Sequence, residues 1–221
     1  MNVLIACEES QRVCTAFRAK GHNAFSADIQ EPSGGHPEWH IKGDVLQILN
    51  TIIGSIDFDT MDGIHHSFGG QWDLIIAHPP CTYLSNAGAR HLYKGGVLQA
   101  DRFQKGMDAK KFFMQFYNAD CERICIENPI PSKCYDLPRY TQVIQPYQFG
   151  HPYKKRTCLW LRGLPELQPT NIVEPVATWC PSGSYSHKHG KQHKGMFTTD
   201  RAKNRAKTFE GIALAMAAQW G

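Results

Sequence analysis

The sequence predicts an α/β protein in which helices cover a doubly wound, mostly parallel sheet. Short apolar runs typical of buried strands alternate along the chain with segments of helical periodicity. The first of these runs covers residues 3–7; an acidic turn, a helical pattern ending near Gly21 and a second run over residues 23–27 follow it. Strand, turn, helix, glycine stop and strand form a βαβ unit, from which parallel sheets are built.

Length and composition favour one soluble globular domain over residues 1–221. The 221 residues are enough for one buried core and few for two, with 42% hydrophobic and 20% charged residues. No apolar run approaches membrane-spanning length, and a strand follows the first residues directly, so we expect a cytoplasmic protein without a membrane partner. The eight cysteines are scattered, which favours reduced thiols over disulfides. A net charge of +4 is compatible with a polyanionic partner without requiring one.

The remaining elements are assigned by the same patterns, and residues 54–70 form a polar insertion with no assignment. A phenylalanine-rich stripe at helical spacing, from Phe103 to Tyr117, is interpreted as core. The other expected elements are a short helix over 46–53, a central strand from residue 72, a basic loop over 86–94 that closes over a ligand, a buried strand over 123–127, an antiparallel hairpin with strands 142–145 and 157–161, and a last helix over 208–220.

The central strand leads directly into a Pro79-Pro80-Cys81 turn. Two prolines fix two backbone φ angles, so the turn is stiff and can aim a thiol into a crevice. In open α/β sheets, ligands bind where parallel strands end at their carboxyl side, and Cys81 lies there. Taken alone, however, a cysteine after a strand is more often an ordinary buried residue.

Carboxylates end three of the other expected segments. Asp28 ends the second strand, Asp44 follows a glycine-rich loop, and Glu127 ends the strand before Asn128 and a proline. A carboxylate in the position of Asp28 can accept hydrogen bonds from ribose hydroxyls, although a solvated turn residue is an equal alternative. No G-x-G-x-x-G follows the first strand, which argues against a dinucleotide. A glutamate at the depth of Glu127 has a perturbed proton affinity more often than a surface one, as acid–base catalysis requires.

Several basic and cysteine-containing stretches have two interpretations. Lysines and arginine at 154–156 form a solvated face or contact phosphates. Cys121 and Cys125 belong to a strand pattern rather than a metal pair. The basic stretch over 179–194 contains Cys180, His187, His189 and His193 at a spacing of no standard zinc finger, so we expect it to grip phosphates and to bind no metal.

The order of these motifs resembles the cytosine-5 DNA methyltransferase family, in the form of a small phage- or prophage-like member without a full target-recognition domain. The resemblance covers residues 1–163 and the last helix, and rests mainly on Pro-Pro-Cys with the downstream Glu127-Asn128-Pro129. It implies a Rossmann-like, class I S-adenosylmethionine-dependent methyltransferase fold and S-adenosyl-L-methionine as cofactor. It also implies DNA as the partner, with the target cytosine flipped out of the helix.

The resemblance also implies roles for individual residues. Cys81 would add to carbon 6 of cytosine, Glu127 would relieve the charge at ring N3, Asn128 would hold the site, and Lys155 matches the first arginine of the family's basic hairpin. The expected cofactor-binding residues are Cys7, Glu8, Ser10, Asp28, Ile29, Asp44, Val45, His78 and Pro79. The expected substrate-binding residues are Pro80, Ser85, Arg90, Lys154, Arg156, His187, His189 and Lys191.

The chain departs from the family at three places. Cys7-Glu8-Glu9-Ser10-Gln11-Arg12 replaces its glycine-rich first loop, and Tyr153 and Thr157 replace two residues of the basic hairpin. Only residues 164–207 are available for target recognition. Two other hypotheses therefore stay open: a non-catalytic nucleic-acid-binding protein with this fold, and a methyltransferase acting on RNA or a free pyrimidine nucleotide.

Overall fold

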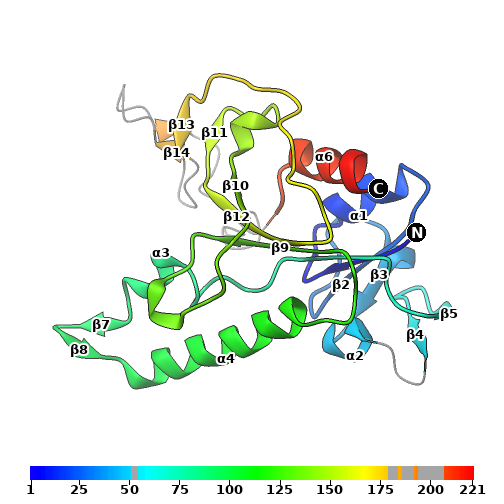
Figure 1. Ribbon diagram of the computed structural model, residues 1–221, viewed down its shortest axis with the longest axis horizontal. Coiled ribbons are helices and arrows are strands. Elements are labelled where there is room, and N and C mark those ends of the chain that lie inside the picture. Colours follow the sequence, from blue (N-terminus) through cyan, green and yellow to red (C-terminus); the bar gives the residue numbers. More distant parts are fainter. Residues whose placement is uncertain (51–53, 179–183, 186–191, 194–206) are drawn as a thin grey trace.

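A seven-stranded central sheet organises the computed structural model, which describes residues 1–50, 54–178, 184–185, 192–193 and 207–221 (Figure 1). Its strands are β1 (Asn2–Ala6), β2 (Asn23–Asp28), β3 (His40–Lys42), β6 (Leu74–Ala77), β9 (Ile124–Pro129), β10 (Gln142–Ile144) and β12 (Thr157–Arg162). Their order is β10-β12-β9-β6-β1-β2-β3. Only β12 runs against its neighbours, because it pairs antiparallel with both β9 and β10. This is the predicted Rossmann-like, class I methyltransferase arrangement, including the antiparallel hairpin at the end.

Helices cover both faces of this sheet. The helices α1 (Arg12–Arg18) and α6 (Glu210–Trp220) lie on one face, and α2 (Leu46–Leu49) and α4 (Ala100–Tyr117) lie on the other (Figure 1). Because side chains alternate across a strand, Val3 and Ile5 of β1 pack on the α1/α6 side and Leu4 packs on the α4 side. The core therefore has two layers, and both are built from the apolar runs that the sequence analysis identified.

Three segments differ from the sequence expectation. The unassigned insertion is a hairpin of β4 (Ser55–Asp59) and β5 (His65–Gly69), whose Phe58 and Phe68 contact Trp72. Its alternating apolar positions were hidden among polar ones. The helix expected over 46–53 ends at Leu49 because Asn50 is extended, and residues 51–53 lie outside the described residues.

The third differing segment is the expected basic loop, which contains regular structure. It forms α3 (Asn86–Ala89) and the first strand of a hairpin, β7 (Tyr93–Lys94) with β8 (Val97–Leu98). Gly95 and Gly96 form its two-residue turn with φ angles of 57° and 80°, which favour glycine. The loop expectation was therefore wrong for most of residues 86–94, since the Gly-Gly turn lies just beyond them.

A second, four-stranded sheet contains β11 (Tyr153–Lys154), β13 (Ala177–Thr178), β14 (Ser184–Tyr185) and β15 (Gln192–His193). It joins the basic turn before β12 to the segment expected to contact the target. Short 3₁₀ helices η1 (Pro37–Trp39), η2 (Lys133–Tyr135) and η3 (Pro146–Gln148) complete the described elements. Among the described helices, none combines the length and the apolar character needed to span a membrane.

The carboxyl ends of the parallel strands define one edge of the sheet. The chain places β2 and β3 on one side of β1 and then crosses to place β6 and β9 on the other. Such a reversal opens a crevice outside the strand ends, where ligands bind in open α/β sheets. Cys7 and His78 directly follow β1 and β6, Asp28 ends β2, and Glu127 lies two residues before the end of β9, which runs on to Pro129 instead of ending at Glu127 as expected; all four lie toward this edge.

One glycine fixes the distance between α4 and the segment after β9. Gly106 of α4 is buried against the ring of Tyr135, and a methyl group there would overlap this ring. We expect Gly106→Ala to lower the free energy of unfolding by about 1–3 kcal/mol in urea titrations, because the core cannot take up the extra atom. Gly69→Ala is the control, since a methyl group there meets open space. Equal stability of the two variants would contradict this packing.

Candidate active site

A pocket of about 490 Å³ lies at the carboxyl ends of β1 and β2, beside α4. Five residues predicted to bind the cofactor line it, namely Cys7, Asp28, Ile29, Asp44 and Val45, together with Pro80 from the Pro-Pro-Cys turn. A volume of this size suits a small-molecule site. The structure thus brings together four loops, those that follow β1, β2, β3 and β6, around one cavity.

The loops after β2 and β3 each contribute one carboxylate to this pocket. Asp28 Oδ1 accepts a hydrogen bond from the Gln30 backbone N–H at 2.9 Å, and Asp44 Oδ1 accepts one from the Leu46 N–H at 3.0 Å. These turns fix both side chains in place. Burial, with a further contribution from the charges of Asp28 and Asp44, raises the pKa of Cys7, so this thiol stays protonated. Cys7 is therefore a wall of the pocket and not a nucleophile.

The sequence analysis missed the wall that α4 contributes. Lys105, Asp108, Ala109 and Phe112 line the pocket at helical spacings of three and four residues. Phe112 was assigned to the core stripe, and nothing in the pattern distinguished its neighbours Lys105 and Asp108 from a solvated helix face. The amphipathic period could have pointed to this face only if the position of α4 over β1 and β2 had been known.

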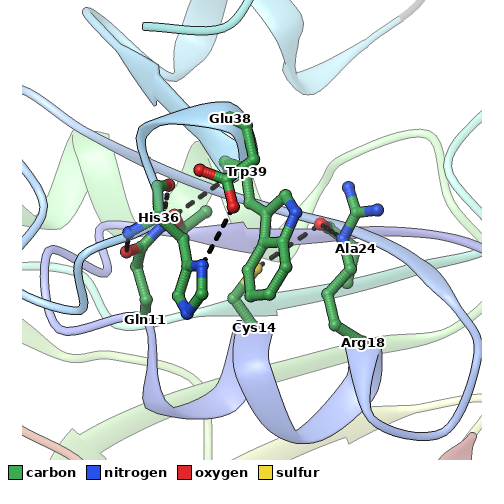
Figure 2. A network of polar contacts seen from close by, with 8 residues as sticks. Gln11, Cys14, Arg18, Ala24, His36, Glu38 and Trp39 are labelled. Carbon is green, nitrogen blue, oxygen red and sulfur yellow. Dashed lines mark hydrogen bonds and ion pairs between the residues drawn. The ribbon is translucent and has the colours of Figure 1, made fainter. Parts of the chain in front are cut away.

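The loop between β1 and α1 adopts left-handed backbone conformations, which glycine usually provides, at two non-glycine residues. Cys7 and Gln11 have φ angles of 59° and 56°, in the left-handed region that non-glycine residues rarely adopt. Gln11 is fully buried, and its amide is fully used: Oε1 accepts from the His36 N–H at 3.1 Å, and Nε2 donates to His36 O at 2.8 Å and to Ser26 Oγ at 3.2 Å (Figure 2). These bonds tie the loop after β2 to the start of α1.

An aromatic stack extends this network outward. The His36 ring stacks on Trp39 with ring centroids 3.8 Å apart, and the Arg18 guanidinium lies 5.3 Å from the Trp39 ring (Figure 2). Arg18 Nε also donates to Ala24 O at 2.7 Å. Residues from α1, β2 and the segment before β3 are therefore locked together, which holds the backbone that carries Asp28 and Asp44.

Glu8 is buried at the start of α1 and does not line the pocket. Its carboxylate accepts hydrogen bonds from the backbone N–H groups of Val13 at 2.7 Å and Cys14 at 3.2 Å. Burial raises the pKa of Glu8 by more than these bonds and the nearby His78 lower it. Ser10 Oγ lies 3.4 Å from Glu8 and is also absent from the pocket lining, so both of these predicted cofactor residues shape the loop from behind.

His78 and Glu127 form a buried ion pair at the ends of β6 and β9. Ala77 pairs with Ile126 in the parallel register, so the residues that follow them, His78 and Glu127, are neighbours. His78 Nδ1 lies 3.0 Å from Glu127 Oε2, and the two side chains are only 9% and 12% exposed. Burial opposes both charges, yet the hydrogen bond and the opposite charges raise the pKa of His78 and lower that of Glu127. Both shifts favour the charged forms, an imidazolium paired with a carboxylate.

The loop with Cys81 is attached to this pair. Asn128 Nδ2 donates to the carbonyl oxygen of Pro79 at 2.9 Å, and Pro79 is buried. Cys81 is half-buried three residues after His78. Further along, Ser85 Oγ accepts from the Gly88 N–H at 3.2 Å and caps α3. The predicted nucleophile and the predicted acid–base residue therefore belong to two strand ends that are hydrogen-bonded to each other.

The remaining predicted residues lie farther out or outside the described part. Arg90, Lys154 and Arg156 are exposed, and Lys155 is half-buried with its ammonium 5.7 Å from the Phe209 ring. His187, His189 and Lys191 lie outside the described residues, as do Cys180 and the side chain of His193. Within the described part of the chain, no group of three His, Cys, Asp or Glu side chains is arranged to hold a metal ion.

The strand order and the pocket define the class of the fold as Rossmann-like and methyltransferase-like. No protein-family model matches the sequence, and no curated protein does. Among solved structures, the chain is similar to the Entamoeba histolytica methyltransferase EhMeth, with 14% identity and a TM-score of 0.41. The match covers 82% of this chain and 58% of that one, so this chain spans less than two thirds of its neighbour. The assignment of the fold rests on the strand order itself.

The buried ion pair makes stability depend on pH in two directions. The raised pKa of His78 contributes stability that is complete below its unfolded value of 6.5 and is lost as the pH rises through the folded value. The lowered pKa of Glu127 contributes stability that is present above 4.5 and is lost as the pH falls through its folded value. We therefore expect the pair to stabilise the fold most between pH 4.5 and 6.5.

Urea unfolding of the wild type and of Glu127→Gln at pH 5.5 and pH 8.5 measures this contribution. Removing one partner of a buried pair lowers the free energy of unfolding by about 3–5 kcal/mol. We expect the variant to lose most of this free energy at the lower pH, where both members of the pair are charged. The difference between the two proteins narrows at the higher pH because His78 is then losing its charge. A difference that does not change with pH would contradict the ion pair.

Proposed function

We propose that this protein transfers a methyl group from S-adenosyl-L-methionine to carbon 5 of cytosine in DNA, through a covalent adduct with Cys81. The observation that carries the proposal is the joined edge of β6 and β9. There Glu127 precedes Asn128, which is hydrogen-bonded to Pro79 of the turn that carries Cys81, and Pro80 of the same turn lines the pocket of Asp28 and Asp44. A nucleophile, an acid–base group and a cofactor-sized cavity are the parts that this reaction needs.

The pocket fits the proposed cofactor. Its two fixed carboxylates can accept hydrogen bonds from ribose hydroxyls and from an amino group, and Ile29, Val45 and Phe112 offer apolar surface to an adenine ring. When bound, S-adenosyl-L-methionine would supply an electrophilic methyl group carried on a sulfonium.

The protein's own groups would perform the rest of the chemistry. The Cys81 thiolate forms a bond to carbon 6, because carbon 5 of cytosine is too weak a nucleophile until the ring becomes an enamine. Glu127 stabilises the ring nitrogen N3 as charge develops there, and Asn128 holds the turn that carries the thiol. After methylation, carbon 5 loses its proton and the bond between sulfur and carbon breaks, which restores the thiolate.

The surroundings of the site are consistent with a nucleic-acid substrate. Arg90 in the segment after Cys81, and Lys154 and Arg156 next to β12, are exposed cations that can meet phosphates. Arg102 donates to Gly88 O at 3.0 Å and lies over the Tyr83 ring, which fixes the base of the α3 segment on α4. A base inside a duplex has to flip out to reach Cys81.

A trapping experiment tests this function. The protein is incubated with S-adenosyl-L-methionine and DNA containing 5-fluorocytosine, which cannot lose the carbon 5 substituent after methylation. We expect intact-mass spectrometry to show a methylated protein–DNA adduct in the wild type and in the control Cys134→Ser, because Cys134 is an exposed cysteine elsewhere. Cys81→Ser should form none.

Two results would contradict the proposal. One is the absence of an adduct although cofactor binding is demonstrated, which would favour the non-catalytic nucleic-acid-binding hypothesis. The other is an adduct that persists in Cys81→Ser. If DNA gives no adduct, the incubation is repeated with RNA that contains 5-fluorocytosine and with the free nucleotide. The molecule that then forms an adduct identifies the substrate class.

A substitution in the pocket tests the cofactor site separately. We expect Asp28→Asn to weaken binding of S-adenosylhomocysteine by about 10- to 100-fold in calorimetry, because a hydrogen bond to a charged group is worth about 1.5–3 kcal/mol. Glu31→Gln is the control, since Glu31 is an exposed carboxylate that pairs with Lys42 and does not line the pocket. Equal weakening by both substitutions would argue for a general loss of negative charge instead of a specific contact.

A further inference from the structure

Only one of the two ring nitrogens of His78 has a hydrogen-bond partner among the described residues. Its Nδ1 is bonded to Glu127, whereas its Nε2 is buried and has no hydrogen-bond partner among the described residues. The resemblance assigns His78 to the cofactor, yet the side chain does not line the pocket and points to Glu127. Because its hydrogen bond goes to Glu127, a candidate catalytic carboxylate, we infer that His78 acts on this carboxylate and does not contact the cofactor.

The charges around His78 favour its protonated form. Glu127 faces it from the end of β9, and Glu8 acts on it from the loop after β1. Lys155, from the turn before β12, opposes the proton on His78 and favours the carboxylate of Glu127. His78 is therefore influenced by two acidic side chains, one from the loop after β1 and one from β9.

An ionised Glu127 cannot by itself give a proton to a pyrimidine ring. Its pKa is held below the ordinary value, so near neutral pH the group is a carboxylate and only accepts hydrogen bonds. Addition of a thiolate at carbon 6 makes ring N3 basic, and the transition state is stabilised if a proton arrives there. Among the described residues, His78 Nδ1 lies 3.0 Å from this carboxylate, which also accepts a hydrogen bond from the Thr208 hydroxyl; of these two partners, the imidazole is the one that can carry an acidic proton.

We propose that His78 is a positioning residue that acts through Glu127: it fixes the orientation of the carboxylate and is the source of the proton that Glu127 passes to the substrate ring. This inference rests on the proposed function. In net terms, one proton leaves His78 Nδ1 and reaches ring N3 through the Glu127 carboxyl group as the bond between sulfur and carbon 6 forms. Neutral His78 and ionised Glu127 remain, and the proton returns when the adduct breaks down, so charge and protons balance.

Two variants separate orientation from proton supply. The side-chain amide of His78→Asn can still donate a hydrogen bond from about the position of Nδ1 but carries no exchangeable charge, whereas His78→Ala removes both. We expect kcat of His78→Asn to fall by about 100-fold, within the range for general acid catalysis, with KM for DNA within about twofold of the wild type. His65→Asn is the control, since His65 is exposed on β5 and its imidazole pairs with Asp59 of the same hairpin.

The pH dependence is the more specific readout. The wild-type rate should decline on the alkaline side as His78 loses its proton, and His78→Asn should lack this decline. His78→Ala should lose kcat and also raise KM, because Glu127 is then no longer held. Wild-type kcat and an unchanged alkaline decline in His78→Asn would overturn the inference.

Nuclear magnetic resonance of ¹⁵N-histidine-labelled protein tests the pair without any activity. We expect His78 to titrate above the value of a free imidazole in the wild type and to shift to lower pH in Glu127→Gln. If methyl transfer occurs but the His78 titration ignores Glu127→Gln, the inference is overturned while the proposed function stands. If the titrations are coupled but the wild type transfers no methyl group to any substrate, the proposed function fails and the catalytic role of His78 fails with it.

Discussion

The parallel pairing of β6 with β9 is the constraint on which the candidate site depends. It places His78, the residue after β6, beside Glu127 of β9 and so creates the contact between them at 3.0 Å. Two charges this far from water persist only as a hydrogen-bonded pair, because each alone would be neutralised by its own burial. The Asn128 bond to Pro79 then links the Pro-Pro-Cys turn to the same strand end. The proposed acid–base group and the proposed nucleophile thus belong to segments that are joined by one strand pairing.

The opposite side of the crevice depends on a buried amide. Gln11 adopts a left-handed backbone and satisfies three hydrogen bonds with His36 and Ser26, which offsets the cost of that conformation. Glu8 satisfies the first N–H groups of α1 in the same loop. A loop without glycine thus keeps the shape that brings Cys7 to the wall of the pocket, and the acidic residues after β2 and β3 face that wall.

Much of this could be predicted from the sequence, and the limits are physical. Apolar runs identified the strands of the main sheet except β3, which lies in a segment expected to be a loop. Asp28 and Glu127 could be placed near one edge because parallel strands end together, although β9 continues two residues beyond Glu127. The contact between Glu127 and His78 could not be predicted from the sequence. His78 is 49 residues away, and the direction of its side chain depends on the register of the strands. Lys105 and Asp108 were missed because the position of α4 over the sheet is a tertiary fact. The β4–β5 hairpin was hidden because its apolar residues are outnumbered by polar ones.

A crystal structure of the complex with S-adenosylhomocysteine tests most directly the claim that the cofactor and the reacting groups meet at the carboxyl edge of the sheet. The account predicts the nucleoside in the pocket between Asp28 and Asp44, with the sulfur toward Pro80 and the turn that carries Cys81. Ligand bound at another place, or a pocket that stays empty at saturating concentration, would contradict it.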